Sequence, residues 1–100
     1  MPETVLVADH GVAAVQVLHD CQAESIKAVS VHTAADADAP HAVMADESVL
    51  LGPELSSYDD VVALVEAARQ AGADAVHPAG RELPGLEQAV RDAGLDWLGP

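Results

Sequence analysis

The sequence predicts an α/β fold, an open parallel sheet of about five strands with helices on both faces. Short apolar runs of strand length alternate with longer segments in which apolar residues recur at helical spacing. The short runs are almost continuously apolar, which is typical of strands buried on both faces of a parallel sheet. The chain has 100 residues, half of them apolar. A chain of this length has room for one core, so we expect a single domain over residues 1–100.

The first half of the chain reads as strand, helix and strand. Residues 4–8, TVLVA, form the first expected strand, and residues 26–32 form the second. Between them a helix is expected from Gly11 or Val12 to about residue 24. Its apolar face would carry Val12, Val15, Leu18 and Cys21. Such a unit has a right-handed crossover almost without exception. A short helix over residues 39–45 and a third strand over residues 48–51 follow.

The second half repeats this alternation. A helix is expected after Ser57, which would be its N-cap, with Asp60 three residues later. Gly72 would end that helix. Residues 73–77 form the fourth expected strand. Pro84 suits the first turn of a last helix that Gly94 ends, and residues 95–98 make a short final strand. Together these elements predict a Rossmann-like sheet.

The charge balance excludes two classes of partner. The formal net charge is -13, from 4 basic and 17 acidic residues. Such a chain repels phosphate backbones and anionic membrane surfaces, so we expect no nucleic acid and no membrane among its partners. No apolar span or signal segment is evident, and Cys21 has no second cysteine to pair with. We therefore expect a cytoplasmic protein in which Cys21 is a buried structural residue.

Polar residues gather where the expected strands end. In open α/β sheets, ligands bind outside the carboxyl ends of the strands. The residues that directly follow each strand are therefore the first candidates for a binding site. These candidates are Asp9, His10 and Gly11, residues 32–36 from His32 onward, Gly52 and Pro53, and residues 77–81, which include His77, Gly80 and Arg81.

The turn after the first strand does not read as a dinucleotide site. It has one glycine, Gly11, where the dinucleotide fingerprint has three, so no NAD or FAD is expected. The helix that begins at Gly11 still offers free backbone N–H groups that could meet an anion. The simpler interpretation is that Asp9 or His10 caps this helix.

The sequence predicts neither a metal site nor a catalytic nucleophile. None of the five histidines is part of a recognised metal-binding spacing. His32 and His77 could approach each other, with Asp36 nearby, only if their strands lie suitably. No serine sits on a strand-to-helix elbow, and Cys21 lies inside a helix. We therefore expect no catalytic residue and no metal ligand.

Several spaced motifs together resemble one known family. VLVADHGVAAVQVLHDC is similar to the start of biotin carboxylases, V-L-I-A-N-R-G-E-I-A followed by a helix of R-x-x-R-A-C type. IKAVSVHTAADADAPHAVMADESVLLGP is similar to A-V-x-S-x-A-D-x-x-x-x-H-x-x-x-A-D-E-x-x-x-x-G-P. The S-Y helix start, ADAVHP and AGLDWLGP continue the resemblance over essentially the whole chain.

The resemblance implies the Rossmann-like domain that precedes the ATP-grasp module in biotin carboxylases and in the related subunits of acyl-CoA and pyruvate carboxylases. In that family ATP, magnesium and biotin are handled by the module that follows. This chain reaches only Gly99 and Pro100, where that module would start. The resemblance therefore implies no cofactor on this chain and no ligase activity of the chain alone.

The chain departs from the family pattern in its polar loops. The family's Asn-Arg-Gly-Glu after the first strand is here Asp9-His10-Gly11-Val12. The family's H-P-G-Y-G-F-L-S-E-N loop, which borders the biotin cleft, is here His77 and Pro78 followed by AGRELPG. The paired glycines and the tyrosine are absent. The helical arginines that contribute to bacterial dimers correspond to Gln16 and His19.

The leading hypothesis is an accessory or interaction module of a carboxylase complex. Its expected partners are carboxylase subunits or a separate ATP-grasp protein, and a homo-oligomer is also considered. An apolar patch near Trp97, Leu98 and the last helix would serve such contacts. The alternative for Trp97 is a role as core filler.

Two other hypotheses stay open. The first is a small-molecule or acid–base site at the carboxyl edge of the sheet, because histidine beside carboxylate suits proton transfer at neutral pH. Its residues would be Asp9, His10, His32, His77 and Arg81. Arg81 could hold an anionic group there, or it could be a loop residue paired with Glu82 or another acid. The second is the excised first domain of an active carboxylase.

Overall fold

The protein is built on one parallel sheet. The computed structural model describes residues 2–99, so Pro100, the last residue of the quoted motifs, lies outside the described residues. The strands are β1 (Thr4–Val7), β2 (Lys27–Thr33), β3 (Glu47–Gly52), β4 (Ala75–His77) and β5 (Asp96–Trp97). They form a 5-stranded sheet in the order β3-β2-β1-β4-β5, and every pairing is parallel. The predicted fold class is therefore confirmed.

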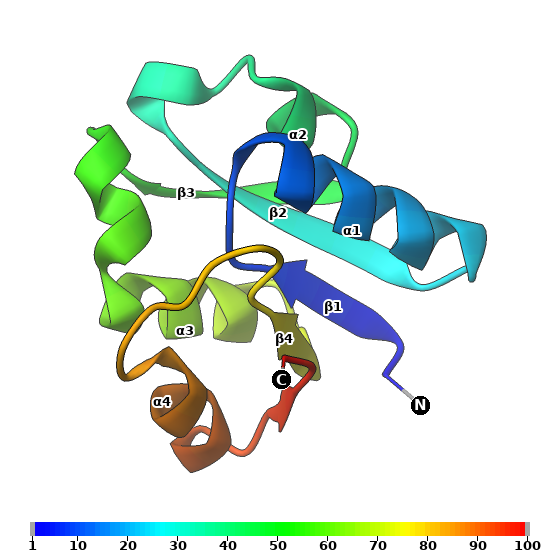
Figure 1. Ribbon diagram of the computed structural model, residues 1–100, viewed down its shortest axis with the longest axis vertical. Coiled ribbons are helices and arrows are strands. Elements are labelled where there is room, and N and C mark those ends of the chain that lie inside the picture. The colour runs from blue at the N-terminus through cyan, green and yellow to red at the C-terminus, as the bar shows by residue number, and fades with distance from the viewer. Residues whose placement is uncertain (1, 100) are drawn as a thin grey trace.

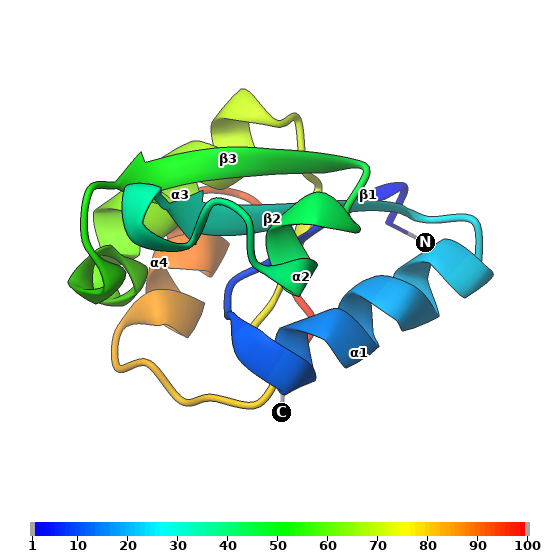
Figure 2. The ribbon, with the colours of Figure 1, turned by 90° about the horizontal axis from the view of Figure 1, so that it is seen from above.

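Helices cover both faces of this sheet. The α-helices are α1 (Gly11–Ala23), α2 (Pro40–Val43), α3 (Val61–Gln70) and α4 (Leu86–Asp92), and the 3-10 helices are η1 (Ala34–Asp36) and η2 (Leu55–Asp59). Helix α1 lies on one side of the sheet, and α3 and α4 lie on the other (Figure 1). The view turned by 90° shows β3 at an outer edge of the sheet (Figure 2). No helix among residues 2–99 is long and apolar enough to cross a membrane.

The central strand β1 divides the core in two. Side chains of successive strand residues point to opposite faces. Accordingly Val5 and Val7 pack in the cluster beneath α1, whereas Leu6 packs in the cluster beneath α3 and α4. All three are fully buried. The chain has no phenylalanine, and the largest fully buried side chain is Tyr58. Tyr58, which carries a polar hydroxyl group, therefore occupies part of the core.

Three local expectations about helices were wrong. Ser57 lies within η2, and the N-cap of α3 is Asp60, whose side chain accepts a hydrogen bond from the N–H of Ala63. Pro84 precedes the last helix, whose N-cap is Gly85 in a left-handed conformation with φ 86°. The side chain of Val12 is 87% exposed, because the buried face of α1 is formed by Ala14, Leu18 and Cys21. Burial raises the pKa of the Cys21 thiol, in keeping with a structural role.

The revised cap gives a direct test. Replacing Asp60 by Ala removes the acceptor for the Ala63 N–H and should lower the free energy of unfolding by about 1 kcal/mol. Urea denaturation followed by circular dichroism measures this change. Ser57→Ala is the matched comparison, because Ser57 was the expected cap. A larger loss in Ser57→Ala than in Asp60→Ala would contradict the assignment.

Candidate functional site

The order of the strands fixes where a ligand would be expected. From β1 the chain continues to β2 and β3 on one side, then crosses to β4 and β5 on the other. The strand order therefore reverses between β1 and β4, and open α/β sheets bind ligands in the crevice at such a point. Residues 78–85, which connect β4 to α4, loop across the carboxyl end of β1 (Figure 1). The candidate site is thus framed by the residues that follow β1 and β4.

The side chain of Arg81 fills this crevice. Its Nε donates a hydrogen bond to the carbonyl oxygen of Ala8 at 3.1 Å. Its Nη1 bonds Asp59 Oδ1 at 3.1 Å, and its Nη2 donates to the carbonyl oxygen of Tyr58. The side chain is only 19% exposed. Arg81 therefore joins its loop to the end of β1 and to the 3-10 helix η2. Its ion-pair partners are Asp59 and Asp9 rather than Glu82.

Asp9 attaches the same loop to β1. This carboxylate is 7% exposed. Its Oδ2 accepts a hydrogen bond from the N–H of Gly80 at 3.3 Å, and its Oδ1 accepts one from the N–H of His10 at 2.8 Å. Its Oδ1 also lies 3.8 Å from Arg81 Nε. Asp9 therefore fixes the loop to β1. His10 is the N-cap residue of α1, as expected, although its side chain makes no capping hydrogen bond.

Gly80 is needed for packing at this point. A Cβ on Gly80 would lie 2.9 Å from the Cβ of Ala13, closer than real Cβ atoms approach. The preceding residue, Ala79, has a positive φ of 56°. The loop is thus pressed against α1 in a conformation that leaves Gly80 no space for a side chain. The structure brings together Asp9, Gly80 and Arg81 from the candidates.

The candidate histidines make contacts outside this group. His32 Nδ1 lies 2.6 Å from Ser48 Oγ, across the pair of strands β2 and β3. His77 Nδ1 accepts a hydrogen bond from the N–H of Ala79 at 2.9 Å. The ring of His10 lies over the ring of Tyr58, with centroids 4.4 Å apart. Gly11 begins α1 with a φ of 77° and is exposed. Within residues 2–99 no group of three His, Cys, Asp or Glu side chains could hold a metal ion.

A buried network of Asp36, His41 and Tyr58 lies beside the crevice. The hydroxyl of Tyr58 donates to Asp36 Oδ2 at 2.6 Å and lies 2.8 Å from His41 Nε2. His41 Nε2 also lies 3.1 Å from the carbonyl oxygen of Val31. Because the tyrosine proton goes to Asp36, His41 Nε2 must carry the proton that meets both oxygens. Asp36 Oδ1 in turn accepts from the N–H and the hydroxyl of Thr33, each at 2.8 Å.

Burial governs the protonation of this network. It lowers the pKa of His41, although the nearby Asp36 carboxylate acts in the opposite direction. Burial and the hydrogen bond to Asp36 raise the pKa of Tyr58. Burial also opposes ionisation of Asp36, but the hydrogen bonds from Tyr58 and Thr33 outweigh it, so the pKa of Asp36 is lowered. At neutral pH the network holds neutral histidine, neutral tyrosine and carboxylate.

This protonation pattern suits a structural role. His41 is 2% exposed and Tyr58 is 1% exposed, so both side chains are held inside the protein. The network instead fastens η1, α2 and η2 to the carboxyl end of β2. Neither His41 nor Tyr58 was among the candidate residues predicted from the sequence. Both occur in the quoted motifs, as the histidine of A-D-x-x-x-x-H and the tyrosine of S-Y, and this was the available signal.

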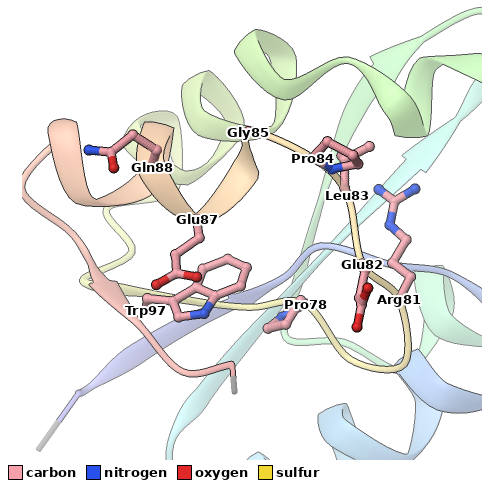
Figure 3. A pocket seen from close by; sticks show the side chains of 9 residues that line it. All are labelled: Pro78, Arg81, Glu82, Leu83, Pro84, Gly85, Glu87, Gln88 and Trp97. Carbon is pink, nitrogen blue, oxygen red and sulfur yellow. The ribbon is translucent and has the colours of Figure 1, made fainter.

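Two cavities lie near the carboxyl ends of the strands. One of about 470 Å³ lies against the start of α1 and is lined by His10, Gly11, Val12, Val15, Asp36, Ala39, Pro40 and His41. The other, of about 610 Å³, lies between residues 78–85 and α4 and includes Trp97 (Figure 3). Trp97 is half-buried and packs against the core beneath α3 and α4, while Leu98 is 37% exposed.

The contacts of Arg81 can be tested by substitution. Arg81→Ala removes hydrogen bonds to two backbone carbonyls and one carboxylate, so the free energy of unfolding should fall by about 2 kcal/mol. Arg81→Lys should recover only part of this, because an ammonium group lacks the planar fork of donors. Urea denaturation measures both. Arg69, which is exposed on α3, provides the control, and Arg69→Ala should change stability by less than about 0.5 kcal/mol. Equal effects at the two positions would show that Arg81 does not bridge these segments.

Two histidines whose pKa values are lowered by burial predict how the stability of the fold depends on pH. Burial lowers the pKa of His77 as well as that of His41. A histidine in the unfolded chain has a pKa of about 6.5. At a pH between this value and the lowered pKa of the folded state, the unfolded chain binds more protons than the folded chain does. Stability from these histidines is therefore full above about pH 6.5 and is lost as the pH falls through the folded pKa values.

The measurement compares urea midpoints at about pH 7.5 and about pH 5.5 for the natural sequence and for His77→Gln. The loss on acidification should be smaller in His77→Gln. His19→Gln, at an exposed position of α1, controls for the general change in charge. An unchanged pH dependence in His77→Gln would contradict the prediction.

Comparison with known proteins places the chain in a family. The family described as "Biotin carboxylase, N-terminal domain" matches residues 1–100. The biotin carboxylase of Haemophilus influenzae is 37% identical over 105 residues, covering 100% of this chain and 23% of that protein. The biotin-dependent acyl-coenzyme A carboxylase alpha3 subunit of Mycobacterium leprae is 42% identical over 101 residues, covering 96% of this chain and 17% of that protein.

Solved structures agree with this relationship. The biotin carboxylase of Campylobacter jejuni in complex with β,γ-ATP superposes with a TM-score of 0.92 at 27% identity, covering 100% of this chain and 24% of that chain. The urea carboxylase of Kluyveromyces lactis gives a TM-score of 0.93 at 29% identity, covering 99% of this chain and 9% of that chain. In each comparison the chain spans less than a quarter of its relative. From the matching family, the relatives and the fold, this chain belongs to the biotin carboxylase N-terminal domain family.

Proposed function

We propose that this domain is an accessory or interaction module of a biotin-dependent carboxylase and does not carry out carboxylation by itself. The catalytic steps would belong to an ATP-grasp module that this domain supports. The proposal is the same for a module on a separate polypeptide and for one joined to this chain. The proposed binding partners are carboxylase subunits and the ATP-grasp module.

The observation that carries this proposal is the position of Arg81. The crevice between β1 and β4 is where a Rossmann-like sheet would bind a small ligand. Here Arg81 directs its donors to Ala8, Tyr58 and Asp59, and Asp9 is engaged with Gly80. The Arg81 guanidinium and the Asp9 carboxylate, which could bind a ligand, thus form hydrogen bonds within the protein itself. This favours a scaffold over a substrate site.

The sequence of the loop supports the same view. In the family pattern, glycines and a tyrosine follow His-Pro in the loop that borders the biotin cleft. In this chain Ala79, Gly80 and Arg81 stand there, and Gly80 is packed against α1. Within the described residues no cluster of metal ligands is present for magnesium. The family resemblance implies that ATP, magnesium and biotin are bound by the partner module.

A second candidate function is small-molecule binding at the cavity of about 470 Å³ beside α1. The cavity favours it because it contains two of the predicted candidates, His10 and Gly11, together with apolar walls. A ligand there should produce chemical-shift changes at Gly11 and Val15, and His10→Ala should remove these changes. His19→Ala provides the control.

The proposed function predicts two results for the purified chain. Incubated with MgATP, bicarbonate and biotin, it should form no carboxybiotin and hydrolyse no ATP above the blank. Used as bait in extract of its own cells at low and high salt, it should retain an ATP-grasp, carboxyltransferase or biotin-carrier protein. Mass spectrometry identifies what is bound.

A surface variant tests whether the recovery of a carboxylase component depends on one face of the domain. Leu98 is 37% exposed near Trp97, so Leu98→Glu should reduce recovery of the carboxylase component at least about fivefold. Val62→Glu, at a 77% exposed position on α3, should leave recovery unchanged. Formation of carboxybiotin by the chain alone would overturn the proposal. So would recovery of a stoichiometric small molecule with no protein.

A further inference from the structure

The larger cavity combines apolar walls with carboxylates. It has a volume of about 610 Å³ and lies between the loop of residues 78–85, the start of α4 and β5. Pro78, Leu83 and Pro84 provide apolar surface, and the indole of Trp97 forms part of the wall (Figure 3). Cavities of this size are typical of sites that take a small organic group.

Two glutamates reach this cavity from different walls. Glu82 belongs to the loop, and Glu87 belongs to the first turn of α4. In Figure 3 the carboxylate of Glu87 lies beside the indole of Trp97, while the guanidinium of Arg81 points away from Glu82. Glu87 pairs with Arg91 at 3.0 Å along α4. Glu82 has no ion pair with any residue among 2–99.

We propose that this cavity binds the arginine or lysine side chain of a partner protein. The alkyl stem would lie along Leu83 and Pro84, and the cationic group would meet the Glu82 carboxylate and the indole of Trp97. Cations are attracted to indole faces, and the long stems of these side chains pack on apolar surface. This inference deepens the proposed function, because it gives the chemistry of the contact with the partner.

The charge of the surroundings favours a cation over an anion or a neutral group. The chain carries a net charge of -13. The local cations are already paired, Arg81 with Asp59 and Arg91 with Glu87. A phosphate or carboxylate would therefore meet Glu82 without a compensating positive charge. A cationic side chain would instead neutralise Glu82 as it enters.

Trp97 is the only tryptophan of the chain and reports directly on the cavity. The probes are the peptide acetyl-Gly-Arg-Gly-amide and its citrulline counterpart, which has nearly the same shape without the charge. The arginine peptide should change the Trp97 fluorescence and shift the amide signals of residues 82–88. The citrulline peptide should bind at least about fivefold more weakly.

Matched glutamate variants locate the binding. Glu82→Gln should weaken the arginine peptide by about fivefold, whereas Glu66→Gln, at an exposed position of α3, should leave its affinity unchanged. Equal binding of the two peptides, or equal effects of the two variants, would overturn the inference. So would shifts spread over the acidic surface without focus on residues 82–88.

The same variant separates this inference from the proposed function. Glu82→Gln as bait should retain less of the carboxylase component than the natural sequence does. Undiminished recovery with Glu82→Gln would reject the cavity and leave the accessory role standing. Specific peptide binding without recovery of any carboxylase component would reject the accessory role and leave the cavity standing.

Discussion

A single guanidinium group at the centre of the sheet's carboxyl edge connects the parts of this domain. From the loop of residues 78–85, Arg81 donates hydrogen bonds to Ala8, which follows β1, and to Tyr58 and Asp59 of the 3-10 helix η2. It holds Tyr58 by the backbone carbonyl, while Asp36 and His41 hold the hydroxyl of the same residue. The crevice and the buried network therefore meet at Tyr58. Because Tyr58 and His41 are almost fully buried, the hydrogen bonds of the network depend on one another for correct geometry.

The sequence was sufficient to predict the sheet and its helices, because their signals are local. A continuous apolar run of strand length, such as residues 4–8, is typical of a strand that is buried on both faces of a parallel sheet. The ends of the helices were harder to predict. Ser57 and Asp60 are both good caps, and the 3-10 turn that buries Tyr58 decides between them. The burial of Tyr58 in η2 therefore outweighed the local preference of Ser57 for the N-cap position.

The sequence predicted which end of the sheet the candidate residues occupy but not the contacts that they make. The rule for parallel sheets correctly located Asp9, Gly80 and Arg81 at one edge. It could not show that their polar atoms face one another rather than a ligand. His41 and Tyr58 are 17 residues apart and meet only through the fold. Their pairing with Asp36 gives the histidine and the tyrosine of the quoted motifs a structural role, because these positions maintain the structure around β2.

The order of the strands also constrains how the chain can fold during synthesis. Strand β1 pairs with β2, about two dozen residues later, and with β4, whose first pairing residue is Ala75. The first three strands can therefore assemble while the other edge of β1 still lacks its partner. An unpaired edge of Val5, Leu6 and Val7 is the kind of surface that recruits strands from other chains. The interval before β4 emerges from the ribosome is thus the period in which this small domain is most exposed to aggregation.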